Sequence, residues 1–176
     1  MHKVKRWLAL AIMLTIPATS LATPAVAGAT LRISEVMASN NATLEDSFGQ
    51  FSDWIEIVNQ GSEPIDLSGM CLSDKEDKLD KYTFPAGTKL EPGAYLLLFA
   101  SGLKNDLLPD ERHVPFKLSA AEEAVYLSKD GEVLDAITFT EQESDVSLAL
   151  DQDGTMKLTI TPTPGWANQI VAPDGD

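Results

Sequence analysis

Residues 53–69, DWIEIVNQGSEPIDLSG, constrain the fold most tightly, because they have the pattern of a strand, a turn and the start of a second strand. Ile55 and Ile57 alternate with polar residues, which is the two-residue period of a half-buried strand. The next residues, 59–62 (NQGS), tolerate a tight turn, and the alternation resumes after Pro64. We therefore expect a β-hairpin around which the remaining strands are arranged.

The rest of the chain repeats this pattern of short alternating segments separated by turn residues. The expected strands cover residues 30–38, 53–59, 65–72 with a bulge at Gly69, 82–84, 94–100, 124–129, 133–139, 146–150 and 156–160. Asp130-Gly131 and Asp153-Gly154 are typical of hairpin turns. About nine or ten short strands, with no long helical pattern and no internal repeat, predict an all-β fold with two packed sheets.

Three segments carry further expectations. Residues 94–100, AYLLLFA, are apolar on both faces, which favours a central strand covered on both sides over an exposed edge for a partner. Residues 39–52 and 73–81 are long polar loops, and loops on a rigid sandwich commonly carry recognition. Residues 101–114 have no clear period, so His113 is expected to be a solvated or locally bonded loop histidine.

The N-terminus has the pattern of a bacterial secretory signal. Lys3, Lys5 and Arg6 precede an apolar run from Trp7 to Ile16 and a tail of small residues. We expect residues 1–27 to be removed, with cleavage after Ala22 as the alternative. The apolar run is too short for a mature membrane anchor, so a protein of the periplasm or the exterior, with no membrane span in the mature chain, is expected.

Charge and cysteine content narrow the classes of partner. The chain has 27 Asp and Glu against 13 Lys and Arg, for a net charge of −14. Such a surface repels phosphate backbones and anionic lipids, which excludes nucleic acid as an expected partner. The acidity is explained either by a solvated surface or by binding of a cation or a cationic partner. Cys71 is the single cysteine, so no internal disulfide forms, and we expect it to be a small buried hydrophobe.

The residues available for chemistry favour a non-catalytic protein. After cleavage His113 is the single histidine, which leaves no zinc site of several His or Cys ligands. No Gly-x-Ser-x-Gly elbow or glycine-rich phosphate loop is present. Glu35 and Glu56 lie on strands that could be neighbours, so a small carboxylate-based hydrolase is a remote alternative to buried glutamates that accept hydrogen bonds.

Oxygen ligands leave calcium as the metal to consider. The candidate ligands are Asp46 and Asp53 around the first long loop, with Asp74 and Asp77 in the second, and neither loop has EF-hand spacing. A calcium-dependent structural module of the cell surface is therefore the main alternative function. Otherwise no cofactor is expected.

Several segments, in their order and spacing, resemble the lamin tail domain as bacteria carry it. They are residues 33–40 (ISEVMASN), 52–59 (SDWIEIVN), 65–74 (IDLSGMCLSD), 84–88 (FPAGT), 93–96 (GAYL), 99–102 (FASG), 116–119 (FKLS) and 161–165 (TPTPG) with Asn168. The similarity covers residues 30–168 and leaves residues 169–176 as a loose tail. The motif residues are Glu35, Asp53, Trp54, Glu56, Asn59 and Gly69. The resemblance implies an immunoglobulin-like β-sandwich that usually serves as an accessory or interaction module.

These observations together predict an exported, non-catalytic binding or adhesion module. Its partner is expected to be a protein or a glycan, contacted through the two long loops, residues 39–52 and 73–81. The sequence does not indicate which of these partners is bound or whether the protein forms oligomers.

Overall fold

The computed structural model describes residues 30–103 and 110–173, so the expected signal at residues 1–27 lies outside the described residues. Within these ranges the fold is all-β. The strands are β1 (Leu31–Met37), β2 (Trp54–Asn59), β3 (Ile65–Asp66), β4 (Cys71–Ser73), β5 (Tyr82–Thr83), β6 (Lys89–Leu90), β7 (Tyr95–Phe99), β8 (Arg112–His113), β9 (Glu123–Lys129), β10 (Glu132–Phe139), β11 (Ser147–Leu150) and β12 (Met156–Thr159). None of the described segments forms a helix that could cross a membrane.

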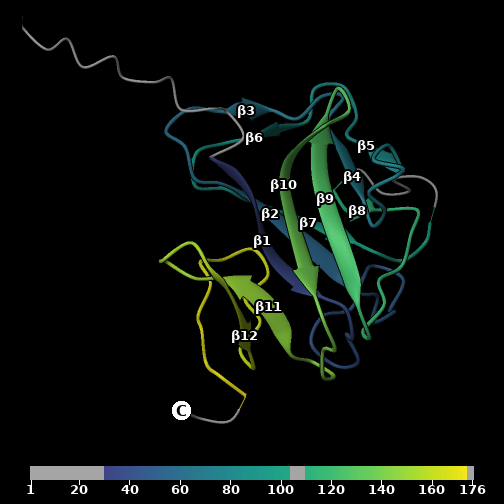
Figure 1. Cartoon of the computed structure of the whole chain (residues 1–176), viewed down its shortest axis with the longest axis vertical. Coiled ribbons are helices and arrows are strands. Elements are labelled where there is room, and N and C mark those ends of the chain that lie inside the picture. The colour runs from purple at the N-terminus through teal and green to yellow at the C-terminus, as the bar shows by residue number, and fades with distance from the viewer. Residues whose placement is uncertain (1–29, 104–109, 174–176) are drawn as a thin grey trace, which may run out of the picture.

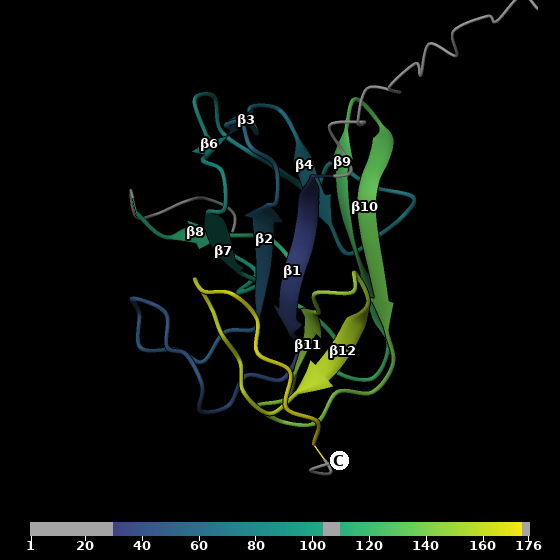
Figure 2. The same ribbon diagram turned by 90° about the vertical axis from the view of Figure 1, so that its left-hand side faces the viewer.

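The strands form an immunoglobulin-like sandwich of two main sheets, which confirms the predicted fold class. The larger sheet has the order β12-β11-β1-β2-β7-β8 and the smaller has the order β10-β9-β4-β5. Strands β3 and β6 pair separately as a short ribbon. The views in Figures 1 and 2 place this ribbon at the upper end of the molecule and β11 and β12 at the lower end.

The hairpin expected within residues 53–69 does not form, because β2 pairs with β1 and β7 and β3 pairs with β6. The single bulged strand expected over residues 65–72 is instead β3 and β4, which belong to different sheets.

The core lies between the inner faces of the two sheets. Fully buried aliphatic side chains of β1, β2 and β7, such as Ile33, Ile57 and Leu98, pack in one cluster with Leu72 of β4 and Leu127 of β9. Every second residue of these strands points to this inner face, as the sequence pattern predicts. The sandwich is the rigid body that positions the loops.

Strand β2 differs from the predicted half-buried strand, because all six of its residues are buried. Its outer face carries Trp54, which packs in a second cluster with Met37 and Phe99. The same outer face carries Glu56, which residues of the C-terminal segment 161–171 cover by hydrogen bonding. The alternating pattern correctly predicted a strand. It could not predict that the outer face is buried, because the segment that covers this face lies about a hundred residues further along the chain.

Three smaller features differ from what the sequence predicts. Strand β7 lies inside the sheet, as expected, but its residues Tyr95, Leu96 and Leu97 are half-buried, because its neighbour β8 spans two residues. Cys71 is a free, half-buried thiol rather than a fully buried one. In the tail expected to be loose, Gln169 and Val171 exchange hydrogen bonds with the Thr159 hydroxyl.

The turn between β9 and β10 forms as predicted. Lys129 pairs with Glu132, so the connection is the two-residue loop Asp130-Gly131. Both loop residues have positive φ angles, 51° and 82°, as a tight turn of this kind requires. This hairpin fixes the register of the two longest strands of the smaller sheet.

Candidate functional site

The four aspartates predicted as calcium ligands do not come together at one place. Asp46 and Asp53 border one hollow beside the first long loop. Asp74 lies next to β4, where its Oδ1 is 2.6 Å from Lys81 Nζ, and Asp77 is exposed. In the described part of the chain, no group of three or more His, Cys, Asp or Glu side chains is placed so that it could hold a metal ion.

Asp46 organises the first long loop through its own hydrogen bonds. Its Oδ1 accepts from the backbone N–H groups of Phe48 and Gln50 at 3.0 and 2.9 Å, and its Oδ2 accepts from the Ser52 hydroxyl at 2.9 Å. The Asp46 N–H donates to the Gln50 carbonyl. A carboxylate that bonds its own loop in this way fixes the backbone from residue 46 to residue 52.

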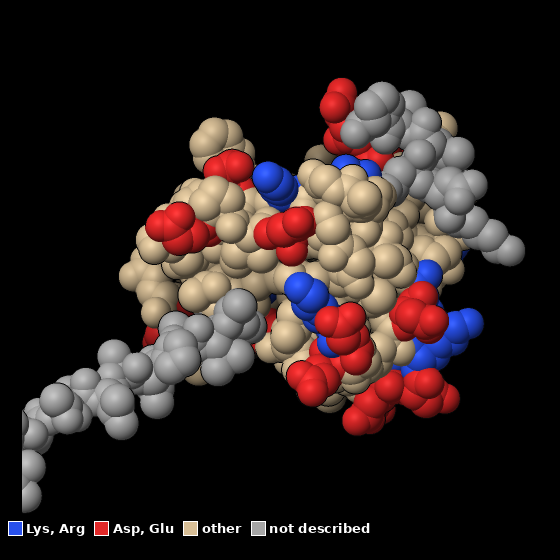
Figure 3. Space-filling view, turned by 90° about the horizontal axis from the view of Figure 1, so that it is seen from above, with Lys and Arg blue, Asp and Glu red and all other residues tan. Residues whose placement is uncertain are grey.

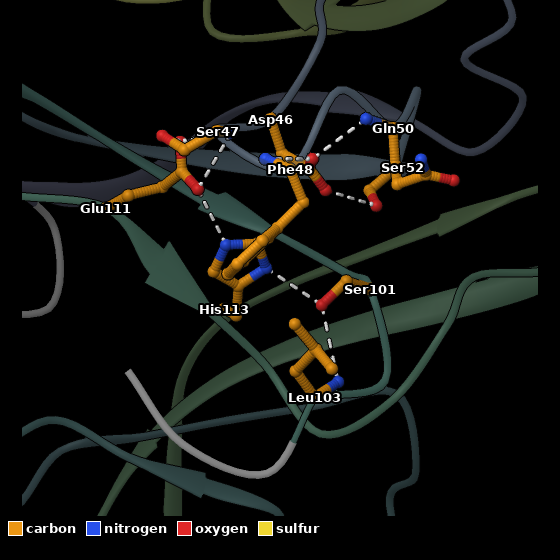
Figure 4. Close-up of polar contacts among 9 residues, drawn as sticks. All are labelled: Asp46, Ser47, Phe48, Gln50, Ser52, Ser101, Leu103, Glu111 and His113. Carbon is orange, nitrogen blue, oxygen red and sulfur yellow. Dashed lines mark hydrogen bonds and ion pairs between the residues drawn. The ribbon is translucent and has the colours of Figure 1, made fainter. Parts of the chain in front are cut away.

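A second set of contacts joins this loop to β8. The carboxylate of Glu111 accepts from the N–H and hydroxyl of Ser47, and its Oε1 is 2.8 Å from His113 Nε2. On the other side of the ring, His113 Nδ1 is 2.9 Å from the Ser101 hydroxyl. Figure 4 shows the histidine between the glutamate and the serine, with the Phe48 side chain across it. These bonds connect residues 46–48, 101–103 and 111–113.

Of the two states that the sequence predicted for His113, solvated or locally bonded in a loop, the structure shows local bonding, to Glu111 two residues away, but on a strand rather than in a loop. His113 is fully buried, and its ring stacks on Phe99 with centroids 5.5 Å apart and lies 5.6 Å from the ring of Phe48. The cause is β8, which pairs in parallel with β7 so that His113 lies opposite Phe99. A two-residue strand has no detectable periodicity, so the sequence gives no signal of it.

The electrostatics of Glu111 follow from these contacts. Partial burial raises the pKa of its carboxyl, but the hydrogen bonds from Ser47 and His113 outweigh burial and hold that pKa below its ordinary value. Glu111 is therefore the charged acceptor that ties the loop to β8.

A hollow of about 510 Å³, which we call the loop hollow, opens beside these contacts. Its lining residues are Asp46, Phe48, Gln50, Phe51, Ser52, Asp53, Ala100, Ser101, Leu103 and Lys117. The side chains of Phe48 and Phe51 are 47% and 40% exposed at its rim. Burial raises the pKa of Asp53, opposed by a bond from the Asn40 N–H and by Lys117. The second long loop, residues 73–81, contributes no residue to this lining.

Glu35 and Glu56 occupy a different place, on the outer face of the larger sheet. They lie opposite each other on β1 and β2, where a bulge between Ile33 and Glu35 shifts the register. Glu35 accepts from the Ser147 hydroxyl and from Thr163, and Glu56 Oε2 accepts from the Gly165 N–H. Both side chains are fully buried, so their contacts are those of structural carboxylates beneath the C-terminal segment.

Burial shifts the pKa of both carboxyl groups upward. Burial raises the pKa of Glu35, although hydrogen bonds from Ser147 and Thr163 oppose it. Burial is also the main cause at Glu56, where the charge of Glu35 adds to it, and together they raise the pKa of Glu56 to about 7. Glu56 Oε1 has no hydrogen-bond partner. Glu56 is therefore largely protonated at slightly acidic pH.

The motif residues Asn59 and Gly69 have structural roles in turns. Asn59 is buried, and its amide donates to the carbonyls of Glu63 and Leu90 at 2.8 and 2.9 Å. Its Oδ1 accepts from the Gly61 N–H, so it fixes the turn that follows β2. Gly69 has a φ of 75°, and its N–H donates to the Phe84 carbonyl.

Comparison with known families adds one finding. Residues 24–141 match the family model described as Lamin Tail Domain. A search among curated proteins finds no match to the sequence. The matched range ends before β11 and β12 and before the segment that covers Glu35 and Glu56.

Proposed function

Because the chain belongs to the lamin tail domain family, whose immunoglobulin-like fold is often non-catalytic, we propose that it is an exported binding or adhesion module. It recognises a partner through the loop hollow, in the periplasm or outside the cell. The partner is a protein segment that inserts an apolar side chain between Phe48 and Phe51.

The observation that carries this proposal is the exposure of Phe48 and Phe51 on a loop whose backbone is fixed. Two half-exposed phenylalanine side chains cost solvation free energy in the free protein. The loop that presents them does not need to be ordered on binding, since Asp46 and Glu111 already bond its backbone. Binding to a preorganised apolar site avoids much of the entropic cost of association.

The chemistry of the lining favours a protein segment over a glycan. Apolar contact comes from Phe48, Phe51, Ala100 and Leu103, and polar contact comes from Gln50, two serines, two aspartates and the ammonium group of Lys117. Such a lining matches an apolar side chain with the neighbouring N–H and carbonyl groups of a peptide backbone.

Selection from a random dodecapeptide display library tests the proposal. The purified protein is the target, and a Phe48→Ser/Phe51→Ser double variant is the counter-target. Val133→Ser is the matched control, because Val133 is 46% exposed and belongs to β10, away from the loop hollow. We expect peptides that bind the protein and the control equally and bind the double variant at least tenfold more weakly.

Peptides that bind all three proteins equally, or no enrichment over an unrelated target, would overturn the proposal. A glycan array run in parallel identifies the other class of partner. A glycan whose binding is lost in the double variant would replace the protein partner while keeping the loop hollow as the site.

A further inference from the structure

A second hollow lies at the margin of the sandwich, away from the loop hollow. The larger sheet has six strands and the smaller has four, and β11 and β12 form the margin of the larger sheet. Leu148 of β11 is 9% exposed, but its partner Leu158 on β12 is 41% exposed. Figures 1 and 2 both place these two strands at the lower end of the molecule, near the end of β10.

This margin hollow has a volume of about 600 Å³ and lies between β11–β12 and the ends of β9 and β10. Its apolar surface includes Ala124, Phe139, Leu148 and Leu158. The volume lies within the range of pockets that bind small ligands, so a few side chains of a partner can enter it. It shares no lining residue with the loop hollow.

Carboxylates border the apolar surface. Glu122, Glu123 and Glu141 all line the margin hollow, and none of the described lining residues is a lysine or an arginine. Glu123 lies 3.3 Å from Lys75, whereas Glu122 and Glu141 are exposed to solvent. The charge of the rim is therefore complementary to a cationic partner.

An unpartnered amide provides a second, independent indication of a ligand. Gln142 lines the margin hollow and is 4% exposed. Its Oε1 accepts from the Ala38 N–H at 2.8 Å, which fixes the orientation of the amide. Its Nε2 is buried and has no hydrogen-bond partner. A buried donor without an acceptor is costly, and a shift of the rim that opens Nε2 to the hollow would let a carbonyl oxygen of a bound chain supply that acceptor.

We propose that the margin hollow binds a basic, apolar peptide segment, with its aliphatic side chain on Leu148 and Leu158, its lysine or arginine at Glu122 and Glu141, and a backbone carbonyl on Gln142 Nε2. This site is separate from the one in the proposed function. The partner is a protein chain that carries an exposed cationic and aliphatic stretch.

Titration of the protein with acetyl-Gly-Lys-Leu-Lys-Gly-amide, followed by nuclear magnetic resonance, tests the site directly. We expect the side-chain NH2 signals of Gln142 and the amide signal of Leu158 to shift with a single dissociation constant. Replacing both lysines of the peptide with glutamate, or its leucine with serine, is expected to weaken binding at least fivefold.

Matched variants separate the site from long-range attraction to an acidic protein. Glu122→Gln/Glu141→Gln is expected to weaken binding at least fivefold, whereas Glu63→Gln/Glu91→Gln removes two exposed charges elsewhere and leaves it within twofold. Leu158→Asn is expected to weaken peptide binding, whereas Val133→Asn is expected to leave it unchanged.

Equal effects of the two charge variants, shifts confined to other residues, or no binding would overturn the proposal. Sedimentation at several concentrations tests a second copy of the chain as the occupant. Self-association that Leu158→Asn abolishes would assign the margin hollow to a homodimer instead. Phe48→Ser/Phe51→Ser leaves peptide binding here unchanged, so this proposal and the proposed function fail independently.

Discussion

Glu35 on β1 and Glu56 on β2 face each other at the same register position, and both side chains are fully buried. Two carboxylates in this position repel each other when both are charged. The protein accommodates them by hydrogen bonds from the C-terminal segment and by a pKa of about 7 at Glu56. The link between the first strands and residues 163–165 therefore depends on the protonation of a carboxyl group.

Because of the buried pair Glu35 and Glu56, we expect the stability of the fold to depend on pH. The pKa of Glu56 rises from 4.5 to about 7 on folding, so the folded state binds a proton more tightly than the unfolded state. The stabilisation is fully present below pH 4.5 and is lost as the pH rises to about 7. The loss is on the order of 3 kcal/mol. Glu56→Gln cannot titrate, so its unfolding free energy should fall less over this range in urea titrations. Glu63→Gln, at an exposed position, is the control, and parallel curves for Glu56→Gln and wild type would contradict the assignment.

Asn168 attaches the C-terminal segment to the sheet. Its amide donates to the carbonyls of Ser34 and Leu150, both at 2.9 Å. Asn168→Ala leaves two carbonyls without this donor, so we expect a loss of about 1–3 kcal/mol in the free energy of unfolding. Gln169→Ala, at the neighbouring exposed position, should lose less than 0.5 kcal/mol. Equal losses in the two variants, measured by chemical denaturation, would show that Asn168 does not attach the segment.

Glu111 fixes the first long loop through Ser47. Glu111→Ala removes the acceptor of the Ser47 N–H and hydroxyl and of His113 Nε2. We expect hydrogen exchange at the Ser47 amide to become at least tenfold faster, while the core amides of β2 are unchanged. Because the pKa of Glu111 is depressed, the same loosening is expected in the wild type as the pH falls through that pKa. Asp110→Ala, at the preceding exposed position, is the control, and an unchanged Ser47 rate in Glu111→Ala would show that the loop is fixed by Asp46 alone.

Calcium is expected to have no effect on stability. Asp46 already bonds three groups of its own loop, and Asp74 is paired with Lys81. Figure 3 shows basic side chains beside acidic ones on the end of the molecule seen there. Thermal unfolding in chelator, in millimolar Ca2+ and in millimolar Mg2+ should therefore give coincident curves. A ligand at 100 times its dissociation constant would add about 2.7 kcal/mol, so a rise with Ca2+ alone would establish a metal site.

The sequence predicts the parts of the fold that depend on local patterns. Alternation identified the long strands, and Asp130-Gly131 identified the hairpin between β9 and β10. Glu35 and Glu56 were expected on strands that could be neighbours, and they are, but the bulge between Ile33 and Glu35 was not predicted. Contacts between segments far apart in the sequence could not be predicted. Neither the contact of Gly165 with the buried Glu56 nor the pairing of His113 with Phe99 has a local sequence pattern.

The candidate sites were likewise predictable only where they depend on local sequence. The first long loop was predicted to be a contact surface from its polar composition, which stays a prediction, and the roles of Glu111 and His113 in fixing that loop were missed. The margin hollow was missed entirely, because Gln142 and Leu158 come together through the pairing of β11 with β1 and β12.

Recognition by the loop hollow is measured by calorimetric titration of a selected peptide into the protein, the Phe48→Ser/Phe51→Ser variant and the Val133→Ser control under one set of conditions. We expect the same dissociation constant for the protein and the control and a constant at least tenfold higher for the double variant, with unchanged free energies of unfolding. Equal dissociation constants for all three proteins would show that the loop hollow does not bind the partner.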